Sequence, residues 1–297
     1  MRAWIAVLFG LLLHSVRAEH ALVLQTDFGT KDGAVAAMRG VAVGVSPRIA
    51  LYDLSHENTP YDIWEAAYRL KQAAPFWPTG TVFVSVIDPG VGTPRKAVAL
   101  KTKSGHIFVG PDNGTWTLIA EDLGIAAMRE IDAARHLRPG SEKSHTFHGR
   151  DLFVMVGAKL AADRIAFDDL GPELPTDVVR LPYERPHREK DVLIGTIPVL
   201  DFQYGNVWTN IDEGLLGELQ PHYGDHFRVT IIHGGKEKYR GVLPYARTFG
   251  DVAVGTPLLY LNSLMNVALA LNQGDFAKKH GIGSGGGWSV RLEKMKL

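Results

Sequence analysis

The first half of the chain alternates apolar runs with segments whose apolar residues recur at helical spacing. Runs typical of buried strands occupy residues 21–26, 49–54, 81–87, 98–102 and 106–109, of which the last two are expected to pair as a hairpin. Helical spacing occupies residues 32–45, 61–74 and 147–162. Almost wholly apolar strands that alternate with helices predict a mostly parallel sheet with helices on both faces, an α/β sandwich.

The pattern changes near residue 180. Residues 181–191 are rich in proline and charge, as a linker would be. Beyond them, short alternating strands are expected at 192–200, 206–209, 226–232 and 258–261, and an apolar helix at 264–271. We therefore predict an N-terminal α/β domain of residues 19–180, a linker of residues 181–191 and a smaller, β-barrel-like C-terminal domain of residues 192–297.

The chain begins with the pattern of a secretory signal. Arg2 precedes an uninterrupted apolar stretch of residues 3–13, and small residues at Val16 and Ala18 mark a cleavage site after residue 18. A membrane span needs about 20 apolar residues, so this stretch is too short to be one. We expect an exported protein, periplasmic or secreted, without membrane contact after cleavage. A wrongly assigned start codon or a buried first strand would be the alternative.

Composition excludes several classes of function. The 32 Lys and Arg residues balance 32 Asp and Glu residues, which argues against binding to nucleic acid or a membrane surface through bulk charge. Because the chain has no Cys, it cannot form disulfides, thiolate zinc sites or iron–sulfur clusters, nor use a Cys nucleophile. No histidines show the spacing of a metal-ligand motif, so we expect neither a metal nor a redox cofactor.

Four aspartates follow predicted strands, namely Asp27, Asp53, Asp88 and Asp112. Ligands of parallel sheets bind outside the carboxyl ends of the strands, where these residues would gather. Aspartates there are also common helix caps and turn formers, and we expect that of Asp53 and Asp112. The loop after Asp88 is rich in Gly and Pro, and Arg95 at its far side can pair with the carboxylate of Asp88. A merely loop-closing ion pair is the alternative.

Two further clusters carry candidate chemistry. His148 opens the predicted helix at 147–162, where the helix dipole favours a neutral imidazole that can take a proton from water. His145 is a rival for this role, and a capping or packing histidine is the alternative. In the second domain, Tyr204 and Trp208 can stack on a flat heterocycle while Asn206 binds its edge. Turn chemistry and core aromatics would explain them equally.

Six short motifs in chain order resemble those of the S-adenosylmethionine (SAM) hydroxide adenosyltransferases, adenosine-forming SAM hydrolases related to fluorinating and chlorinating enzymes. Each motif alone is weak, but together they span nearly all of the chain after residue 18. The motifs are Thr26-Asp27-Phe28-Gly29 with Asp32, DPGVGTPR from Asp88 to Arg95, GPDNG from Gly110, TFHGRD from Thr146, DFQYGN from Asp201, and Asn262-Ser263.

The resemblance implies a seven-stranded α/β domain, a barrel-like second domain, and cleavage of SAM by water to adenosine and methionine. It implies a homotrimer in which each active site lies between the first domain of one subunit and the second domain of its neighbour. Halogenating relatives carry Tyr-Ser in place of His148-Gly149, which places this chain on the hydroxide side.

The resemblance also implies roles for single residues. Asp88, Arg95 and His148 would activate the water. On the substrate side, Asp27 would hold both ribose hydroxyls and Asn206 the adenine edge. The contacts to the methionine part would come from Asp32, Asp201 and Ser263.

Other functions stay open at this point. The export signal favours a non-catalytic periplasmic protein that binds adenosine or SAM, because SAM is made in the cytoplasm. A metal-dependent nucleoside or phosphoester hydrolase would use oxygen ligands from Asp27, Asp32, Asp53 and Asp88. Halide as the nucleophile is a third alternative, against which the His148-Gly149 pair argues.

Overall fold

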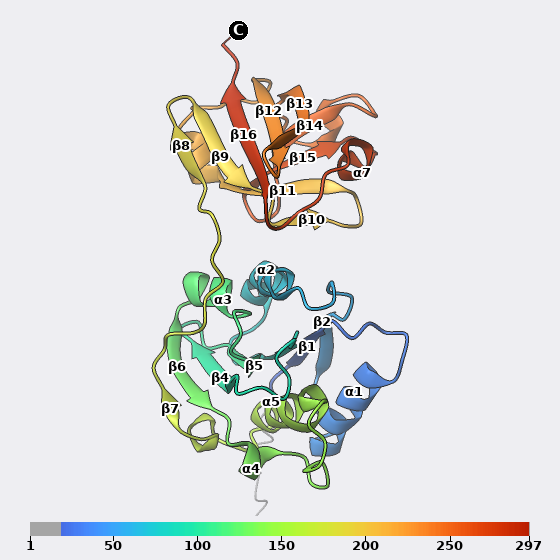
Figure 1. Ribbon diagram of the computed structural model, residues 1–297, viewed down its shortest axis with the longest axis vertical. Helices are drawn as coiled ribbons and strands as arrows, with labels where there is room; N and C mark the ends of the chain where they lie inside the picture. Colours follow the sequence, from blue (N-terminus) through green and yellow to red (C-terminus); the bar gives the residue numbers. More distant parts are fainter. Residues whose placement is uncertain (1–18, 297) are drawn as a thin grey trace, which may run out of the picture.

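The computed structural model describes residues 19–296, which form two lobes joined by an extended segment (Figure 1). The predicted signal, residues 1–18, lies outside the described residues. The N-terminal lobe holds strands β1 to β7, and the C-terminal lobe holds strands β8 to β16. No helix among residues 19–296 combines the length and apolar character that a bilayer crossing needs.

A seven-stranded sheet forms the centre of the N-terminal lobe, in the order β2-β1-β3-β5-β4-β6-β7. Its strands are β1 (Leu22–Thr26), β2 (Leu51–Ser55), β3 (Val82–Val86), β4 (Ala97–Thr102), β5 (Ile107–Pro111), β6 (Ile125–Glu130) and β7 (Glu173–Leu174). The first four strands in this order are parallel, and β4, β6 and β7 are antiparallel. The sheet is thus mixed rather than mostly parallel, because the confirmed β4–β5 hairpin reverses the chain and later strands extend it.

Helices cover both faces of this sheet, as the apolar strands predict. One face packs against α1 (Ala34–Val45) and α5 (Val154–Ala161) and the other against α2 (Ile63–Ala73) and α3 (Thr117–Asp122). Alternate residues of β1 accordingly belong to different cores, Leu22 and Leu24 to one and Val23 to the other. The shorter helical elements are η1 (Ala74–Phe76), α4 (Ala133–His136), the π-helical turn η2 (Gly149–Phe153) and η3 (Phe167–Asp169).

Two antiparallel sheets build the C-terminal lobe, in the orders β10-β11-β15-β14 and β13-β12-β16-β9-β8. The strands are β8 (His187–Glu189), β9 (Val192–Thr196), β10 (Val199–Asp201), β11 (Asn206–Asp212), β12 (His226–His233), β13 (Lys236–Pro244), β14 (Pro257–Leu261), β15 (Asn266–Leu271) and β16 (Trp288–Lys294). Short helices α6 (Glu213–Gly217), η4 (Phe249–Asp251) and α7 (Phe276–His280) join them. The barrel-like closure of this lobe stays a prediction.

Two secondary-structure predictions for this lobe are wrong. The apolar segment 264–271 holds strand β15 instead of a helix, because β11 and β14 pair with both of its edges. A short apolar run cannot be told from a buried helix by periodicity alone. The run 192–200 is two strands in different sheets, β9 and β10, because Pro198 between them lacks the N–H that a continuous ladder needs.

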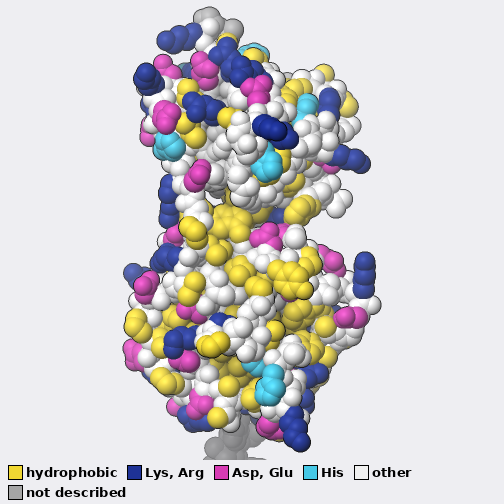
Figure 2. Space-filling view, viewed as in Figure 1, with side chains coloured by type: hydrophobic (Ala, Val, Ile, Leu, Met, Phe, Trp, Pro, Cys, Tyr) yellow, Lys and Arg dark blue, Asp and Glu magenta, His cyan; other side chains and the backbone are white. Residues whose placement is uncertain are grey.

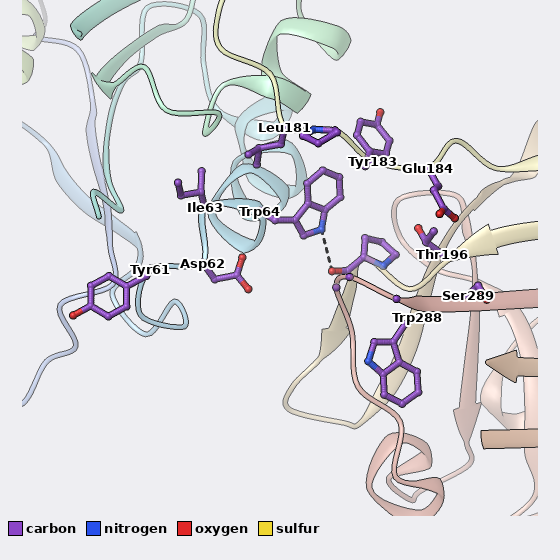
Figure 3. Close-up of a pocket in the computed structure, with 15 residues that line it drawn as sticks. Tyr61, Asp62, Ile63, Trp64, Leu181, Tyr183, Glu184, Thr196, Trp288 and Ser289 are labelled. Atoms are coloured by element: carbon purple, nitrogen blue, oxygen red, sulfur yellow. Dashed lines mark hydrogen bonds between the residues drawn. The ribbon is translucent and has the colours of Figure 1, made fainter. Parts of the chain in front are cut away.

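Helix α2 holds the two lobes together. The indole Nε1 of Trp64 donates a hydrogen bond to the Pro198 carbonyl at 3.1 Å (Figure 3), and Nη2 of Arg69 donates to the Leu200 carbonyl, also at 3.1 Å. Beside these contacts, Tyr68 shares an apolar cluster with Trp208 of β11. A hollow of about 710 Å³ remains between the lobes around Trp64, and none of the residues predicted as a site lines it.

Candidate active site

Three of the four predicted aspartates follow the carboxyl ends of neighbouring parallel strands. Asp27, Asp88 and Asp112 come after β1, β3 and β5, whereas Asp53 lies within β2 and does not end that strand as expected. Asp112 has the structural contact expected of it, since Oδ1 accepts a hydrogen bond from the backbone N–H of Val179 at 3.0 Å. Asp53 likewise accepts its bonds from other side chains of the lobe. Asp27 and Asp88 remain as candidates for ligand contact.

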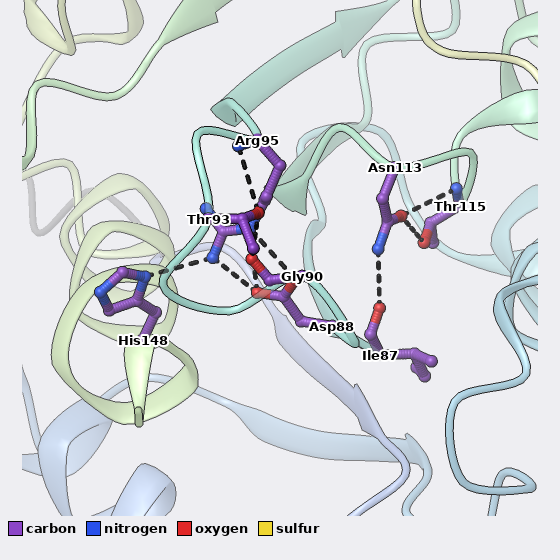
Figure 4. A network of polar contacts seen from close by, with 8 residues as sticks. All are labelled: Ile87, Asp88, Gly90, Thr93, Arg95, Asn113, Thr115 and His148. Carbon is purple, nitrogen blue, oxygen red and sulfur yellow. Dashed lines mark hydrogen bonds and ion pairs between the residues drawn. The ribbon is translucent and has the colours of Figure 1, made fainter. Parts of the chain in front are cut away.

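Asp88, Arg95 and His148 are joined in one polar network (Figure 4). Nε of Arg95 lies 3.1 and 3.0 Å from the two carboxylate oxygens of Asp88, and Nη2 lies 2.5 Å from Oδ2. The same Nη2 is 3.2 Å from Nδ1 of His148. The side chains of Asp88 and Arg95 are only 5% and 12% exposed. A shielded bidentate pair of this kind is rigid, so the imidazole meets a fixed guanidinium.

The network decides where His148 carries its proton. A guanidinium has no acceptor, so Nδ1 of His148 must accept the Arg95 hydrogen bond. A neutral ring then bears its proton on Nε2. Burial, together with the positive charge of Arg95, lowers the pKa of His148 below its ordinary value, which favours this neutral form. His148 precedes the π-helical turn η2, a type of element found often at functional sites.

A cavity of about 370 Å³, the triad pocket, adjoins this network. Its walls are Asp27, Phe28, Pro60, Tyr61, Val86, Asp88, Val91, Thr146, Phe147, His148 and Gly149. The loop that bears His148 packs tightly here, since a Cβ at Gly149 would lie 3.3 Å from side-chain carbons of Phe28 and Val86. The predicted rival His145 is not among the lining residues.

Tyr61 is a feature of this pocket that the sequence analysis missed. It appeared there only as the first residue of a predicted helix, but α2 begins at Ile63. The backbone of Tyr61 is left-handed, with φ of 68°, and its N–H donates to Oδ2 of Asp27 at 2.8 Å. The residue is 73% exposed and lines the pocket. Only the neighbouring Pro60, which restricts the chain ahead of α2, hinted at an unusual turn.

The candidate residues of the C-terminal lobe gather in a second cavity, the aromatic pocket, of about 870 Å³. The predicted residues that line it are Asp201, Tyr204, Asn206, Trp208 and Ser263. Phe249 and Tyr260, whose rings lie 4.9 Å apart, line it as well and were not predicted. Nδ2 of Asn206 donates to Oδ2 of Asp201 at 3.1 Å, which orients its amide.

Two predicted site residues, Arg95 and Asp32, line neither pocket. Arg95 is bonded to Asp88 and His148 of the triad pocket, whereas Asp32 lies beside the start of helix α1. Oδ1 of Asp32 accepts a hydrogen bond there from the backbone N–H of Ala34 at 2.9 Å. The triad pocket and the aromatic pocket have no lining residue in common, since each belongs to one lobe. The predicted site residues of the two lobes therefore lie in two separate cavities.

The metal-ligand alternative was tested against side-chain geometry. Within the described range 19–296, no three His, Asp or Glu side chains gather in a way that would hold a metal ion. Asp53 is already paired with Arg39 and His56. Asp27, Asp32, Asp53 and Asp88 therefore do not form the oxygen-ligand cluster that the metal-dependent alternative requires.

Comparison with protein families assigns both lobes. Residues 22–171 match the model of the SAM hydroxide adenosyltransferase N-terminal domain, and residues 195–289 match that of its C-terminal domain. The chain belongs to the SAM hydroxide adenosyltransferase family. This confirms the resemblance drawn from the six motifs. The triad network lies in the first matched segment and the aromatic pocket in the second.

Individual relatives within and beside this family are similar over most of their length. A protein of Methanocaldococcus jannaschii named (R)-S-adenosyl-L-methionine hydrolase is 43% identical, over 73% of this chain and 76% of that protein. One of the same name from Salinispora tropica is 37% identical over 88% and 93%. A fluorinase of an Actinoplanes species is 28% identical over 89% and 95%. A crystal structure of an uncharacterized conserved Thermotoga maritima protein superposes with a TM-score of 0.83 at 33% identity, covering 91% of this chain and 99% of that one.

Proposed function

We propose that this protein hydrolyses SAM to adenosine and methionine, by attack of an activated water on the ribose 5′ carbon. The observation that carries the proposal is the network of Asp88, Arg95 and His148 at the wall of a pocket that also holds Asp27. Family membership and the names of the relatives support the same reaction. Among residues 19–296, no contact or cavity favours a receptor, a metal-dependent hydrolase or a halogenating enzyme over this reaction.

The reaction requires little of the protein beyond a placed nucleophile. Attack at the 5′ carbon forms a carbon–oxygen bond while the carbon–sulfur bond breaks, and both electrons of that bond go to sulfur. The leaving thioether is neutral and needs no general acid. The site must therefore hold one poorly solvated water in line with the carbon–sulfur bond.

The positions of the protons give His148 and Asp88 different roles toward the attacking water. Nε2–H of His148 donates to the water oxygen, because Nδ1 is already occupied by Arg95. Oδ1 of Asp88 accepts only the 3.1 Å bond from Arg95, so it has a lone pair left for a water proton. In this proposal Asp88 takes that proton as the carbon–oxygen bond forms, instead of His148 as expected from the sequence, because Nδ1 of His148 already accepts from Arg95. Arg95 fixes both partners. The neutral form of His148 is thus the active one.

Substrate contacts come from both pockets in this proposal. Asp27 holds the two ribose hydroxyls. Tyr204 and Trp208 stack on the adenine, whose edge Asn206 binds. Asp201 and Ser263 of the aromatic pocket contact the methionine part, and Asp32, which lies outside both pockets, adds a further contact to it. No cofactor takes part.

A homotrimer completes the site by joining the triad pocket of one subunit to the aromatic pocket of its neighbour. The two pockets belong to different lobes, which supports this arrangement. Large apolar side chains are exposed near both pockets, among them Tyr61, Phe202 and Tyr204. Figure 2 shows apolar side chains gathered at the waist and on the adjoining face of the N-terminal lobe. Contiguous apolar surface of this kind marks protein–protein contact.

The proposal also includes export and the domain plan. Cleavage after residue 18 releases a periplasmic or secreted protein. The N-terminal domain comprises residues 19–180, the linker residues 181–191, and the C-terminal domain, closed like a barrel, residues 192–297.

Incubation of the purified protein with SAM tests the function. We expect adenosine and methionine to appear in equal amounts, and chelator to leave the rate unchanged. Chromatography with mass detection measures both products, and reactions in ¹⁸O-water should place the label in the 5′ hydroxyl. Tight binding of adenosine by folded protein without turnover would instead indicate a receptor.

The pH dependence of the rate tests the state of His148. Because burial and the Arg95 charge lower its pKa, the neutral ring persists below the ordinary histidine pKa of about 6.5. We expect kcat to be constant above that pH and to fall only at more acidic pH, where the protonated ring loses the Arg95 bond. Steady-state rates between about pH 4 and 9 measure this. The His148→Gln variant should lack the acid limb, and a decline already at neutral pH would contradict the assignment.

A further inference from the structure

A series of bonded polar side chains, buried at Thr26 and His56 and exposed at Asp53 and Arg39, lies behind the triad pocket and takes no part in the proposed mechanism. The imidazole of His56 is at its centre, in a residue only 4% exposed. Its Nδ1 lies 2.8 Å from Oγ1 of Thr26, and its Nε2 lies 3.0 Å from Oδ1 of Asp53. The other carboxylate oxygen of Asp53 pairs with Arg39 of α1. The series thus runs from the surface of α1 to the residue just before Asp27.

The direction of each hydrogen bond in this series follows from the charge on Asp53. Although burial opposes it, hydrogen bonds from His56 and Arg39 lower the pKa of Asp53, so its carboxylate is charged and only accepts. The bond between His56 and Asp53 therefore runs from Nε2–H of His56 to Oδ1 of Asp53. Nδ1 then accepts from the hydroxyl of Thr26, and Oγ1 in turn accepts from the backbone N–H of Phe28 at 3.2 Å. Each polar side-chain atom of Thr26 and His56 therefore has a hydrogen-bond partner.

Thr26 is not a nucleophile activated by this histidine. A Thr-His-Asp series suggests one, but Thr26 is fully buried and lines neither pocket. Its oxygen already accepts from Phe28. The hydroxyl consequently cannot contact a substrate. We infer that the series of bonds from Arg39 to Thr26 holds the backbone in place.

The backbone that it holds carries Asp27. His56 fixes the residue before Asp27 through its ring, and its carbonyl accepts from the N–H of Gly29 at 2.7 Å. Five residues beyond His56, the N–H of Tyr61 binds the Asp27 carboxylate itself. Both supports of Asp27 therefore come from the segment of residues 56–61. The distance between the loop that bears Asp27 and that segment depends on the His56–Thr26 bond.

We propose that His56 is a positioning residue for ribose recognition, which acts through Thr26 to aim the Asp27 carboxylate at the two ribose hydroxyls. The proposal rests on the proposed function for the role of Asp27. Each of the two neighbouring hydroxyls binds one oxygen of the Asp27 carboxylate. A small rotation of the loop that bears Asp27 therefore weakens both hydrogen bonds. A ligand without these hydroxyls does not report that rotation.

The test compares adenosine with 2′,3′-dideoxyadenosine, which lacks both hydroxyls. Isothermal titration of the full-length protein gives the dissociation constant of 2′,3′-dideoxyadenosine divided by that of adenosine. This ratio measures recognition of the two hydroxyls. The matched variants are His56→Asn, whose amide takes the place of Nδ1 and keeps the Thr26 bond, and His56→Gln, whose amide takes the place of Nε2 and keeps only the Asp53 bond. Asp27→Asn supplies the reference loss.

We expect the ratio in wild type to fall about tenfold in His56→Gln, as for a lost hydrogen bond to a charged group, and to change less than about threefold in His56→Asn. Equal weakening of both ligands, or an unchanged ratio in His56→Gln while Asp27→Asn lowers it, would overturn the proposal. An unchanged ratio in Asp27→Asn would also overturn it, by removing the ribose role of Asp27. SAM turnover by the wild-type protein decides the proposed function separately.

Discussion

Replacing Asp88 with alanine is expected to lower kcat for SAM hydrolysis about 10²- to 10⁴-fold, the range for losing a positioned acid–base group. The variant loses the acceptor of the water proton and also frees Arg95, whose guanidinium is otherwise held by both carboxylate oxygens. Adenosine should bind with nearly unchanged affinity, because the ribose and adenine contacts lie elsewhere. Steady-state kinetics and calorimetric titration with adenosine measure the two effects.

A pair of His148 variants serves as the control for this prediction. His148→Gln keeps an amide N–H near the position of Nε2 and should retain more of the rate than His148→Ala, which has no donor. If alanine and glutamine lowered kcat equally, donation from Nε2 would be wrong. Full activity in Asp88→Ala and His148→Ala would remove the network from the mechanism altogether.

Mixing two inactive variants is expected to restore activity. Asp88→Ala disables the triad pocket and Asn206→Ala the aromatic pocket, so each variant alone should be nearly inactive. If a site combines the triad pocket of one subunit with the aromatic pocket of the next, random co-assembly of equal amounts leaves about one quarter of the sites intact. Co-expression, followed by purification and a rate measurement, tests this.

The control is a mixture of the two variants purified separately and combined without subunit exchange, which should stay inactive. A site built within one chain would also give no activity after co-expression, since every chain then carries one disabled half. Elution as a monomer on size-exclusion chromatography would equally contradict the trimer.

Much of the N-terminal lobe follows from residue order alone. Apolar strands such as residues 81–87 can be buried on both faces only between layers of helices, and the lobe has that architecture. The contact between Asp88 and Arg95 is also local, since a short Gly- and Pro-rich loop joins them. These features depend on neighbours in sequence, which a pattern can register.

The missed features depend on partners distant in sequence. Strand β15 is specified by pairing with β11 and β14, and its apolar run alone favours a helix as much as a strand. The left-handed backbone of Tyr61 places its N–H against Asp27, which lies far away in the sequence. The bond between Thr26 and His56 likewise joins the end of β1 to the residue that follows β2. Tertiary packing determines the conformation of these residues. Neither secondary-structure propensity nor the spacing of apolar residues contains information about that packing.

The bonds from α2 to Pro198 and Leu200 have a consequence for assembly. They set the angle between the lobes, and in the proposed trimer that angle fixes the rotation from one subunit to the next. Head-to-tail contacts close into a ring of three only when this rotation is one third of a circle, and a rotation that closes no ring continues as an open helix. Trp64 and Arg69, far from any reacting atom, would thereby determine whether the last subunit meets the first.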